Sequence, residues 1–404
     1  MKSRHFAVVA QLGNGHVYPT LPLCAELSKR GHRVTYITNR HYAPMIVEVG
    51  AEPVLISSKR MPNRLVDDLK MSLALPMDDP RVADMMKSWQ SHCADDSIAL
   101  VSQVDSFYSE NSPDMIVYDR YHIAGRILAN RHQVPAVQIS SHFAYYNDLP
   151  FRINGVCQKP DAAAEWSRND DSFLSSCGIE SSGSYWHVEN LNVHLLPKEF
   201  QFNADSFDER FCFAGALLDR PFYPVWKDRS GGRPLILISG ISLFSDTKVD
   251  YSGYFGMLVE ALSELPYHCV LSIGDAEFSR ILPSNFELNR SASHLEILPH
   301  ADLSICHGGM TSTLEAIYHG VPPLMIPMAP ACEEVAYRAE ELGIGVHLSR
   351  AALSIENLRD TVSAMLQDCS LQERVKYASG VFRLSGGAEL AANRIEGCLG
   401  SSSA

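Results

Sequence analysis

Short apolar strands alternate with helices along most of this chain, and that alternation limits what it can fold into. Near the start, the apolar run HFAVVA is followed by the glycine-rich turn LGNGHVYP, then by a helix predicted over residues 20–31, and then by a second strand, HRVTYITN. Strand, helix and strand within about 30 residues form a βαβ unit, whose two strands pair in parallel.

The same unit recurs further along the chain. Residues 113–140 predict a strand at 115–118, a helix that ends near residue 131, and a strand at 136–139. After Gly232 the pattern starts again with PLILISG, a helix, and YHCVLSIG. Two runs of alternating strands and helices predict two doubly wound α/β domains with parallel sheets. The expected boundaries are an N-terminal domain at 1–217, a polar, proline-bearing linker at 218–233, a C-terminal domain at 234–375, and a C-terminal helix and tail at 376–404.

Composition excludes several classes of protein. The 404 residues, 46% hydrophobic and 20% charged, are globular in character and too many for one ordinary core. A net charge of −13 without a stripe of Lys and Arg predicts no nucleic-acid partner. The ten cysteines contain no CxxC pair and predict reduced thiols in a cytoplasmic protein. No apolar run approaches the roughly 18 residues of a membrane span. The oligomeric state cannot be read from the sequence.

The stretch HGGMTST, which starts at His307, predicts an anion site. It follows the strand DLSIC and leads into the helix TLEAIYHG, so its backbone N–H groups and the positive end of the helix dipole face whatever binds there. Gly308 and Gly309 would let the backbone approach a phosphate closely, and the imidazole of His307 could add a donor.

Three side chains on the following helix extend this site. The hydroxyls of Thr311 and Ser312 can donate to phosphate oxygens, and Glu315, about one turn further, can accept from ribose hydroxyls. The alternative is that HGG is only a tight turn, with Thr311 or Ser312 as a helix N-cap.

Two residues at the N-terminal sheet are candidates for acid–base chemistry. His16 lies in the first glycine-rich turn, at the N-terminus of a helix whose dipole disfavours the imidazolium, and a neutral imidazole suits a general base. Asp119 ends the strand MIVYD at the same edge of the sheet. The alternatives are a surface or capping role for His16 and a helix N-cap role for Asp119.

Three stretches together carry a resemblance to a known family. They are GNGHVYPTLPLCAELSKRGHRVTYIT, LNVHLLPKEFQFNADSFDERFCFAG, and residues 307–322 followed by ELGIG. With them the chain resembles glycosyltransferase family 1, and within it the bacterial macrolide-type glycosyltransferases of GT-B fold. The resemblance implies a C-terminal domain that binds a nucleotide-sugar donor and an N-terminal domain that binds a hydrophobic small-molecule acceptor. It also implies that His16 is the catalytic base, that Asp119 is its partner, and that transfer inverts the anomeric carbon without a metal ion or other cofactor.

The predicted donor site departs from the family. Where many members have a tryptophan under the base and then Pro-Gln, this chain has Ser291, Ser293 and His294. Where members usually have an acidic residue and glutamine that hold the sugar hydroxyls, it has Ala331 and Cys332. The loop after PLILIS, expected beside the donor through Ser239 and Ser242, usually contains a glycine next to the donor and here reads Gly240, Ile241, Ser242, Leu243. These changes favour an unusual donor, such as a TDP-linked deoxy- or aminosugar, over conventional UDP-glucose, or else weakened donor binding.

The acceptor is expected to contact loops of the N-terminal domain rich in Met and aromatic residues. The residues chosen as candidates are Gly15, Met85, Trp89, Phe143 and Tyr145. Such side chains suit a hydrophobic natural product, but they can equally pack the loops onto the sheet. Two other functions stay open. One is a catalytically weakened GT-B partner or binding protein, and the other is a GT-B-fold epimerase, which would need carboxylates near the sugar that this chain offers sparingly.

Overall fold

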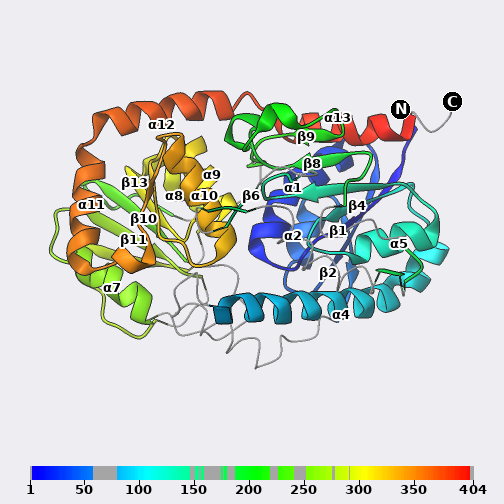
Figure 1. Cartoon of the computed structure of the whole chain (residues 1–404), viewed down its shortest axis with the longest axis horizontal. Coiled ribbons are helices and arrows are strands. Elements are labelled where there is room, and N and C mark those ends of the chain that lie inside the picture. Colours follow the sequence, from blue (N-terminus) through cyan, green and yellow to red (C-terminus); the bar gives the residue numbers. More distant parts are fainter. Residues whose placement is uncertain are drawn as a thin grey trace.

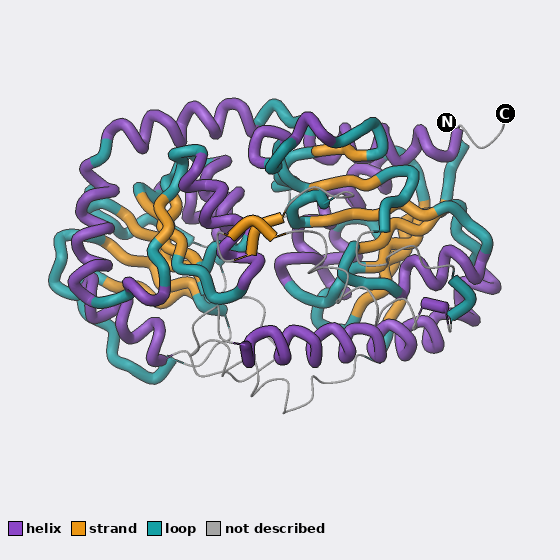
Figure 2. The backbone as a smooth tube through the Cα atoms, in the orientation of Figure 1, coloured by secondary structure: helices purple, strands orange, loops and turns teal. Residues whose placement is uncertain are grey.

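Two parallel sheets, each flanked by helices, lie side by side in the computed structural model of the chain (Figure 1; Figure 2). The structure describes residues 2–57, 80–145, 151–153, 156–158, 174–175, 177–179, 187–218, 226–240, 252–274, 278–290 and 292–400. The predicted fold of two doubly wound α/β domains is confirmed.

The N-terminal sheet has the strand order β3-β2-β1-β4-β5-β8-β9, and all its neighbours pair in parallel. Its strands are β1 (His5–Val9), β2 (Arg33–Thr38), β3 (Glu52–Leu55), β4 (Met115–Asp119), β5 (Ala136–Ser140), β8 (Asn192–His194) and β9 (Phe211–Phe213). The order reverses between β1 and β4, where Val9 pairs with Tyr118. Ligands of open α/β sheets bind at such a switch point.

Helices cover both faces of this sheet, because alternate residues of a strand point to opposite faces. Phe6 and Val8 of β1 pack with the helix α1 (Asn14–Lys29), whereas Ala7 and Val9 pack with α4 (Pro80–Glu110) and α5 (Ala124–His132). The short helix α2 (Ala43–Glu48) precedes β3.

Helix α1 begins at Asn14, earlier than the predicted start at residue 20, so the glycine-rich stretch is mostly its first turn. Pro19 lies inside the helix and has no N–H, so it cannot donate to the carbonyl of Gly15 four residues before it. That carbonyl instead accepts a hydrogen bond from Thr311 Oγ1 at 3.4 Å, across the domain boundary. Pro19, which made the start of the helix hard to recognise in the sequence, thus leaves the carbonyl of Gly15 free to accept a hydrogen bond from the other domain.

The C-terminal sheet has the order β12-β11-β10-β13-β14-β15, again entirely parallel. Its strands are β10 (Leu235–Ser239), β11 (His268–Ser272), β12 (Phe286–Asn289), β13 (Leu303–Cys306), β14 (Pro323–Met325) and β15 (Val346–His347). Its helices are α7 (Ser252–Leu262), α8 (His294–Ile297), α9 (Met310–Tyr318), α10 (Pro330–Glu341) and α11 (Ile355–Gln367).

Smaller elements connect these layers. A two-stranded antiparallel ribbon, β6 (Phe151–Ile153) with β7 (Val156–Gln158), places β6 against α10 of the other domain. Single 3-10 turns occur at Lys198–Phe200, Ala204–Ser206, Leu298–His300 and Arg350–Ala352.

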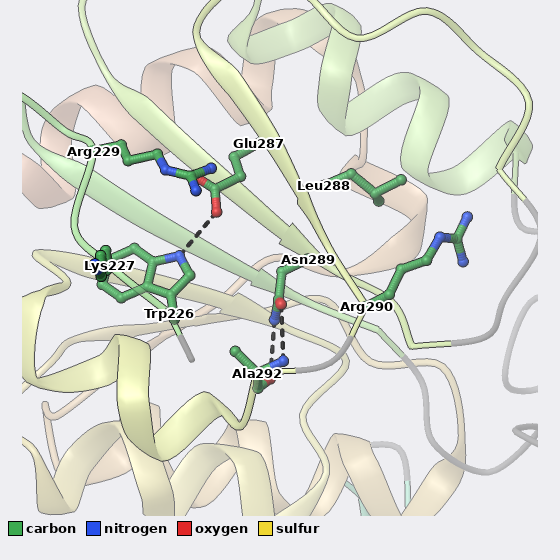
Figure 3. Close-up of a pocket in the computed structure, with 8 residues that line it drawn as sticks. All are labelled: Trp226, Lys227, Arg229, Glu287, Leu288, Asn289, Arg290 and Ala292. Carbon is green, nitrogen blue, oxygen red and sulfur yellow. Dashed lines mark hydrogen bonds and ion pairs between the residues drawn. The ribbon is translucent and has the colours of Figure 1, made fainter. Parts of the chain in front are cut away.

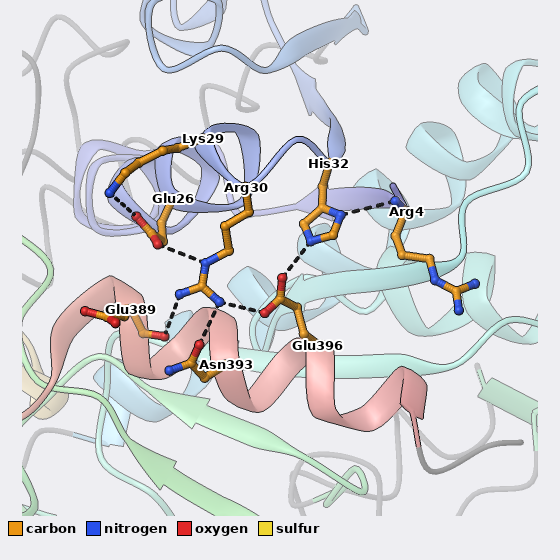
Figure 4. A network of polar contacts seen from close by, with 8 residues as sticks. All are labelled: Arg4, Glu26, Lys29, Arg30, His32, Glu389, Asn393 and Glu396. Atoms are coloured by element: carbon orange, nitrogen blue, oxygen red, sulfur yellow. Dashed lines mark hydrogen bonds and ion pairs between the residues drawn. The ribbon is translucent and has the colours of Figure 1, made fainter. Parts of the chain in front are cut away.

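The C-terminal end of the chain returns to the N-terminal domain. After α12 (Cys369–Phe382), the last helix, α13 (Gly387–Gly400), lies along α1, as the red helix of Figure 1 shows. A polar network holds it there (Figure 4): Arg30 Nη1 lies 2.6 Å from Glu396 Oε2, and His32 Nε2 lies 2.6 Å from Glu396 Oε1. The chain therefore crosses between the domains twice.

The segment between α12 and α13, which forms the second crossing, contacts the residues that follow β9. The backbone N–H of Gly387 donates to the carbonyl of Ala214 at 2.8 Å. Gly215 has a φ of +85°, and a Cβ added to it would clash with the side chain of Ser385. Only glycine meets both demands.

Two expectations from the composition, on the cysteines and on membrane spans, can be compared with the structure. No disulfide joins the cysteines of the described ranges, and Cys24, Cys212, Cys269, Cys306 and Cys332 are buried. In the part of the chain that the structure describes, no helix combines the length and apolar character that a membrane crossing requires.

Candidate active site

The structure brings His16 and Asp119 together. His16 lies in the first turn of α1 and Asp119 is the last residue of β4, so both stand at the carboxyl edge of the N-terminal sheet. Nδ1 of His16 lies 2.6 Å from Oδ2 of Asp119, and the two side chains are 14% and 4% exposed. Neither residue caps a helix: the N-cap residues of α1 and α5 are Gly13 and Ile123. The capping alternatives are therefore wrong.

The electrostatics of this pair differ from the expectation. Burial disfavours the imidazolium, but the charge and the hydrogen bond of Asp119 outweigh it and raise the pKa of His16. Burial likewise opposes ionisation of Asp119, yet the charge and hydrogen bond of His16 lower the pKa of the carboxyl. The sequence indicated only that the helix dipole disfavours the imidazolium; the adjacent buried carboxylate shifts the pKa of His16 in the opposite direction. With Nδ1 bound to Asp119, Nε2 is the nitrogen left to accept a proton.

A second histidine, which the sequence reading missed, stacks on the first. The ring centroid of His142 lies 5.5 Å from that of His16 at an interplanar angle of 26°, and Tyr121 packs edge-on to both rings. Burial and the charge of His16 lower the pKa of His142 to about 3. His142 therefore stays neutral near neutral pH and is a weaker base than His16. Its position just after Ser140, where β5 ends, was the available signal.

The predicted anion site, the loop that starts at His307, leads into the N-terminus of α9 and contains a buried imidazole. His307 follows β13, Gly309 is the N-cap of α9, and no side chain caps that helix. His307 is 7% exposed, and its Nδ1 has no hydrogen-bond partner within the described residues. Burial, followed by the charge of His294, lowers the pKa of His307 to about 4. An unpartnered ring nitrogen beside free backbone N–H groups suits an anion.

The two glycines of this loop are required by their protein neighbours. A Cβ on Gly309 would lie 2.5 Å from Nε2 of His307, and one on Gly308 would lie 2.9 Å from the carbonyl oxygen of Cys332. Gly308 also has a φ of +75°. The glycines thus allow His307 and α10 to pack tightly around the loop, a role that the sequence reading had not assigned to them.

Thr311 and Ser312 lie inside the first turn of α9 and do not cap it. The hydroxyl of Ser312 donates to the carbonyl of Gly309 at 3.4 Å, and that of Thr311 donates to Gly15 of α1. The latter contact joins the first turns of α1 and α9. The candidate base and the candidate anion site therefore face each other across the domain boundary.

Glu315 and His294 meet beside this loop. Glu315 is 4% exposed on α9, and its Oε2 lies 3.8 Å from Nδ1 of His294, the first residue of α8. Ser293 is the N-cap of α8 and forms a capping box with Glu296. The pattern S-x-x-E in SHLE was a readable signal for this role. Ser291 lies outside the described residues.

Comparison with known proteins identifies the family. Along 98% of its length, the chain is 31% identical to NDP-glycosyltransferase YjiC of Bacillus subtilis (strain 168), covering 97% of that protein. The chain belongs to the macrolide-type GT-B glycosyltransferases. Residues 257–379 match the C-terminal domain of the erythromycin biosynthesis protein CIII-like family. Demethyllactenocin mycarosyltransferase of Streptomyces fradiae is 28% identical over 98% of this chain and 86% of its own. The crystal structure of CalG4, the calicheamicin glycosyltransferase, matches with a TM-score of 0.78 and 29% identity over the whole of both chains.

The remaining donor candidates of this glycosyltransferase fall in three environments. Ser239 ends β10, is 4% exposed, and donates to the carbonyl of Ile305 at 3.4 Å. Ala331 is exposed at the start of α10, whereas Cys332 is buried against Gly308. Ser242 lies outside the described residues. Among the residues that are described, no three His, Cys, Asp or Glu side chains converge as a metal site would require.

The residues predicted to contact the acceptor lie in different parts of the structure. Gly15 lies in the first turn of α1 next to His16, and Tyr145 lies at the domain boundary. Phe143 is 2% exposed and packs against Phe200 and Phe202, with ring centroids at 5.7 and 4.8 Å. Its predicted place in the cleft is wrong, because it fills the core between loops. Met85 and Trp89 lie on α4, and their side chains are outside the described part.

Trp226, from the predicted linker, forms hydrogen bonds to the helix α8 and to the edge strand β12. Its indole Nε1 donates to Glu287 Oε1 at 3.1 Å, as Figure 3 shows. Its backbone N–H donates to Glu296 Oε2, also at 3.1 Å. It lines a cavity of about 350 Å³ on the edge strand β12, away from the His16–Asp119 pair. The remaining lining residues are Lys227, Arg229, Glu287, Leu288, Asn289, Arg290 and Ala292. Trp226 thus helps to fix α8, which carries His294.

Proposed function

We propose that this glycosyltransferase moves a sugar, with inversion and without a metal ion, from a nucleoside diphosphate to a hydroxyl of a hydrophobic small-molecule natural product. The contact between Thr311 and Gly15 carries the proposal. It holds the first turn of α9, the candidate anion site, against the first turn of α1, which bears His16. A donor phosphate and an acceptor hydroxyl bound at these two turns would be adjacent, as a direct displacement requires.

The dyad activates the acceptor. Nε2 of His16 takes the hydroxyl proton as the acceptor oxygen attacks the anomeric carbon. Asp119, bound to Nδ1, fixes the ring tautomer and stabilises the imidazolium that forms. The bond from the anomeric carbon to the diphosphate oxygen breaks as the new bond forms, so a single displacement inverts the configuration.

The protein itself can stabilise the departing diphosphate. The N-terminus of α9 offers free backbone N–H groups and its positive dipole end, and His307 offers its unpartnered Nδ1. These groups supply the charge stabilisation that a divalent cation supplies elsewhere, which supports transfer without a metal ion.

The donor is proposed to be a TDP-linked deoxy- or aminosugar, with a UDP-sugar as the second choice. Ala331 and Cys332 replace the hydroxyl-binding pair of the family, which favours a sugar with fewer hydroxyls. The names of relatives support a nucleoside diphosphate donor and natural-product acceptors: one is an NDP-glycosyltransferase, one a demethyllactenocin mycarosyltransferase and one the calicheamicin glycosyltransferase.

Calorimetric titration with TDP, UDP and GDP tests the donor assignment before any acceptor is known. We expect micromolar binding, tightest for TDP. His16→Ala should then abolish transfer while nucleotide binding stays unchanged, and full activity of that variant would refute the mechanism. If none of the three nucleotides binds, the alternative of a catalytically weakened GT-B partner protein, which the loss of the family pair at Ala331 and Cys332 favours, takes its place.

A further inference from the structure

A buried carboxylate of the donor domain reaches into the acceptor domain. Glu334 lies on α10 and is 7% exposed. The hydroxyl of Tyr145, in the loop after β5, donates to its Oε2. The guanidinium carbon of Arg120 lies 5.1 Å from the centroid of the Tyr145 ring. Arg120 directly follows Asp119 of the dyad, so this cluster stands beside the candidate base.

The position of Glu334 on α10 suits a residue that binds the sugar. Ala331 occupies the place where related sequences carry an acidic residue that holds the sugar, and Glu334 follows it by one helical turn. Residues three apart lie on the same face of a helix. This chain therefore has no carboxylate at residue 331 and has one a helical turn later, at Glu334.

We propose that Glu334 and Tyr145 bind the transferring sugar through a hydrogen-bond donor on it, either a hydroxyl or a protonated amine. This inference rests on the proposed function and identifies which residues replace the missing pair. The sugar group would lie against the Glu334–Tyr145 pair, with the phosphates at α9 and the acceptor oxygen at His16.

The carboxylate of Glu334 has capacity for such a partner. A carboxylate can accept about four hydrogen bonds, and within the described residues only the Tyr145 hydroxyl donates to this one. Burial raises the pKa of Glu334 to about 7, although the Tyr145 hydrogen bond and the Arg120 charge act in the opposite direction. A sugar hydroxyl or ammonium would add a second hydrogen bond to this carboxylate.

Contacts other than the hydrogen bond between Tyr145 and Glu334 also hold the two domains together. Arg338, one turn further along α10, donates to the carbonyls of Glu199, Phe200 and Gln201 at 3.0 to 3.1 Å. Gln201 in turn clamps Ala144, the neighbour of Tyr145, through two hydrogen bonds at 2.8 and 3.0 Å. The loop is thus held without Glu334, which leaves that carboxylate available for a ligand.

The test compares nucleotides with nucleotide-sugars. Wild type, Glu334→Gln, Tyr145→Phe and the control Glu340→Gln, an exposed carboxylate on the same helix, are titrated with TDP, UDP and their sugar conjugates. We expect both test variants to bind the bare nucleotides as wild type does. We expect Glu334→Gln to lose about 10- to 100-fold in affinity and in kcat/KM for the sugar conjugates, as for a lost hydrogen bond to a charged group. Tyr145→Phe, which removes one oxygen, should lose about fivefold.

The donors used in the test distinguish the two kinds of sugar. An aminosugar conjugate should suffer more from Glu334→Gln than a neutral hydroxylated one, because it loses a charge pair as well as a hydrogen bond. Unchanged affinity for every conjugate would overturn the inference, and so would equal weakening of bare nucleotides and conjugates, which indicates a structural role. If wild type binds no nucleotide, the proposed function itself fails.

Discussion

His16 and Asp119, 103 residues apart in the sequence, meet with 2.6 Å between Nδ1 and Oδ2 at the carboxyl edge of the sheet, where the strand order reverses between β1 and β4. The contact raises the pKa of His16 above its ordinary value of 6.5. Because the base must be neutral, we expect kcat/KM to rise with pH through that raised pKa.

Asp119→Asn should change this profile in two ways. Loss of the charge lowers the pKa of His16, so the acid limb moves to lower pH, while the plateau falls about 100-fold or more because the imidazolium is no longer stabilised. The profile of kcat/KM between pH 5 and 9 measures both effects. Asp360→Asn, at an exposed site on α11, is the matched control. An acid limb that stays in place in Asp119→Asn would show that the pair does not set the pH dependence.

The stacked ring of His142 should act by positioning His16. His142→Ala removes a ring contact worth about 1 kcal/mol, so kcat should fall about fivefold while KM for the donor stays the same. His142→Phe keeps an aromatic ring at the site and should restore most of kcat. Steady-state kinetics at saturating acceptor separate the two parameters. Equal losses in the two variants would mean that the imidazole nitrogen, and not the stack, matters.

The anion site should depend on His307 and on the space beside it. His307→Ala removes the unpartnered Nδ1 and should weaken nucleoside diphosphate binding about 10- to 100-fold. Gly309→Ala should also weaken it, because the new Cβ would lie 2.5 Å from Nε2 and displace the ring. Calorimetry measures both. Gly253→Ala, in α7 with no atom near its Cβ position, is the control and should bind as wild type. Wild-type affinity in His307→Ala would place the diphosphate elsewhere.

The network at α13 should contribute to stability in a pH-dependent way. Burial opposes ionisation of Glu396, but hydrogen bonds from His32 and Arg30 lower its pKa. The stabilisation is therefore present above the ordinary value of 4.5 and lost as the pH falls through the lowered pKa.

Glu396→Gln tests this contribution. At pH 7 the free energy of unfolding should fall by about 1 to 3 kcal/mol, and the difference from wild type should shrink as the carboxyl protonates in acid. Urea unfolding at pH 7 and pH 4 measures it. Glu373→Gln, at an exposed site on α12, should have little effect at either pH. A constant difference at both pH values would exclude ionisation of Glu396 as the cause.

Much of the fold could be predicted because its information is local. Apolar runs located the strands, and His16, Asp119 and His307 lie at or just after the carboxyl ends of three of them. The start of α1 was missed because Pro19 normally argues against a helix, and here the freed carbonyl of Gly15 is used by Thr311.

The parts of the site that escaped prediction depend on long-range contacts. Glu334 acquires its partner Tyr145 from 189 residues away. His142 matters only because the ring of His16 lies on it. Phe143 looked like a ligand contact because nothing in its local sequence shows that Phe200 covers it.

The return of the chain through α12 and α13 has a mechanical consequence. Where the chain leaves β9, the carbonyl of Ala214 accepts a hydrogen bond from the N–H of Gly387, and Ser385 lies so close to Gly215 that an added Cβ would clash with it. The covalent chain therefore ties the two domains together beside this contact, and non-covalent contacts such as that of Thr311 with Gly15 hold the boundary elsewhere.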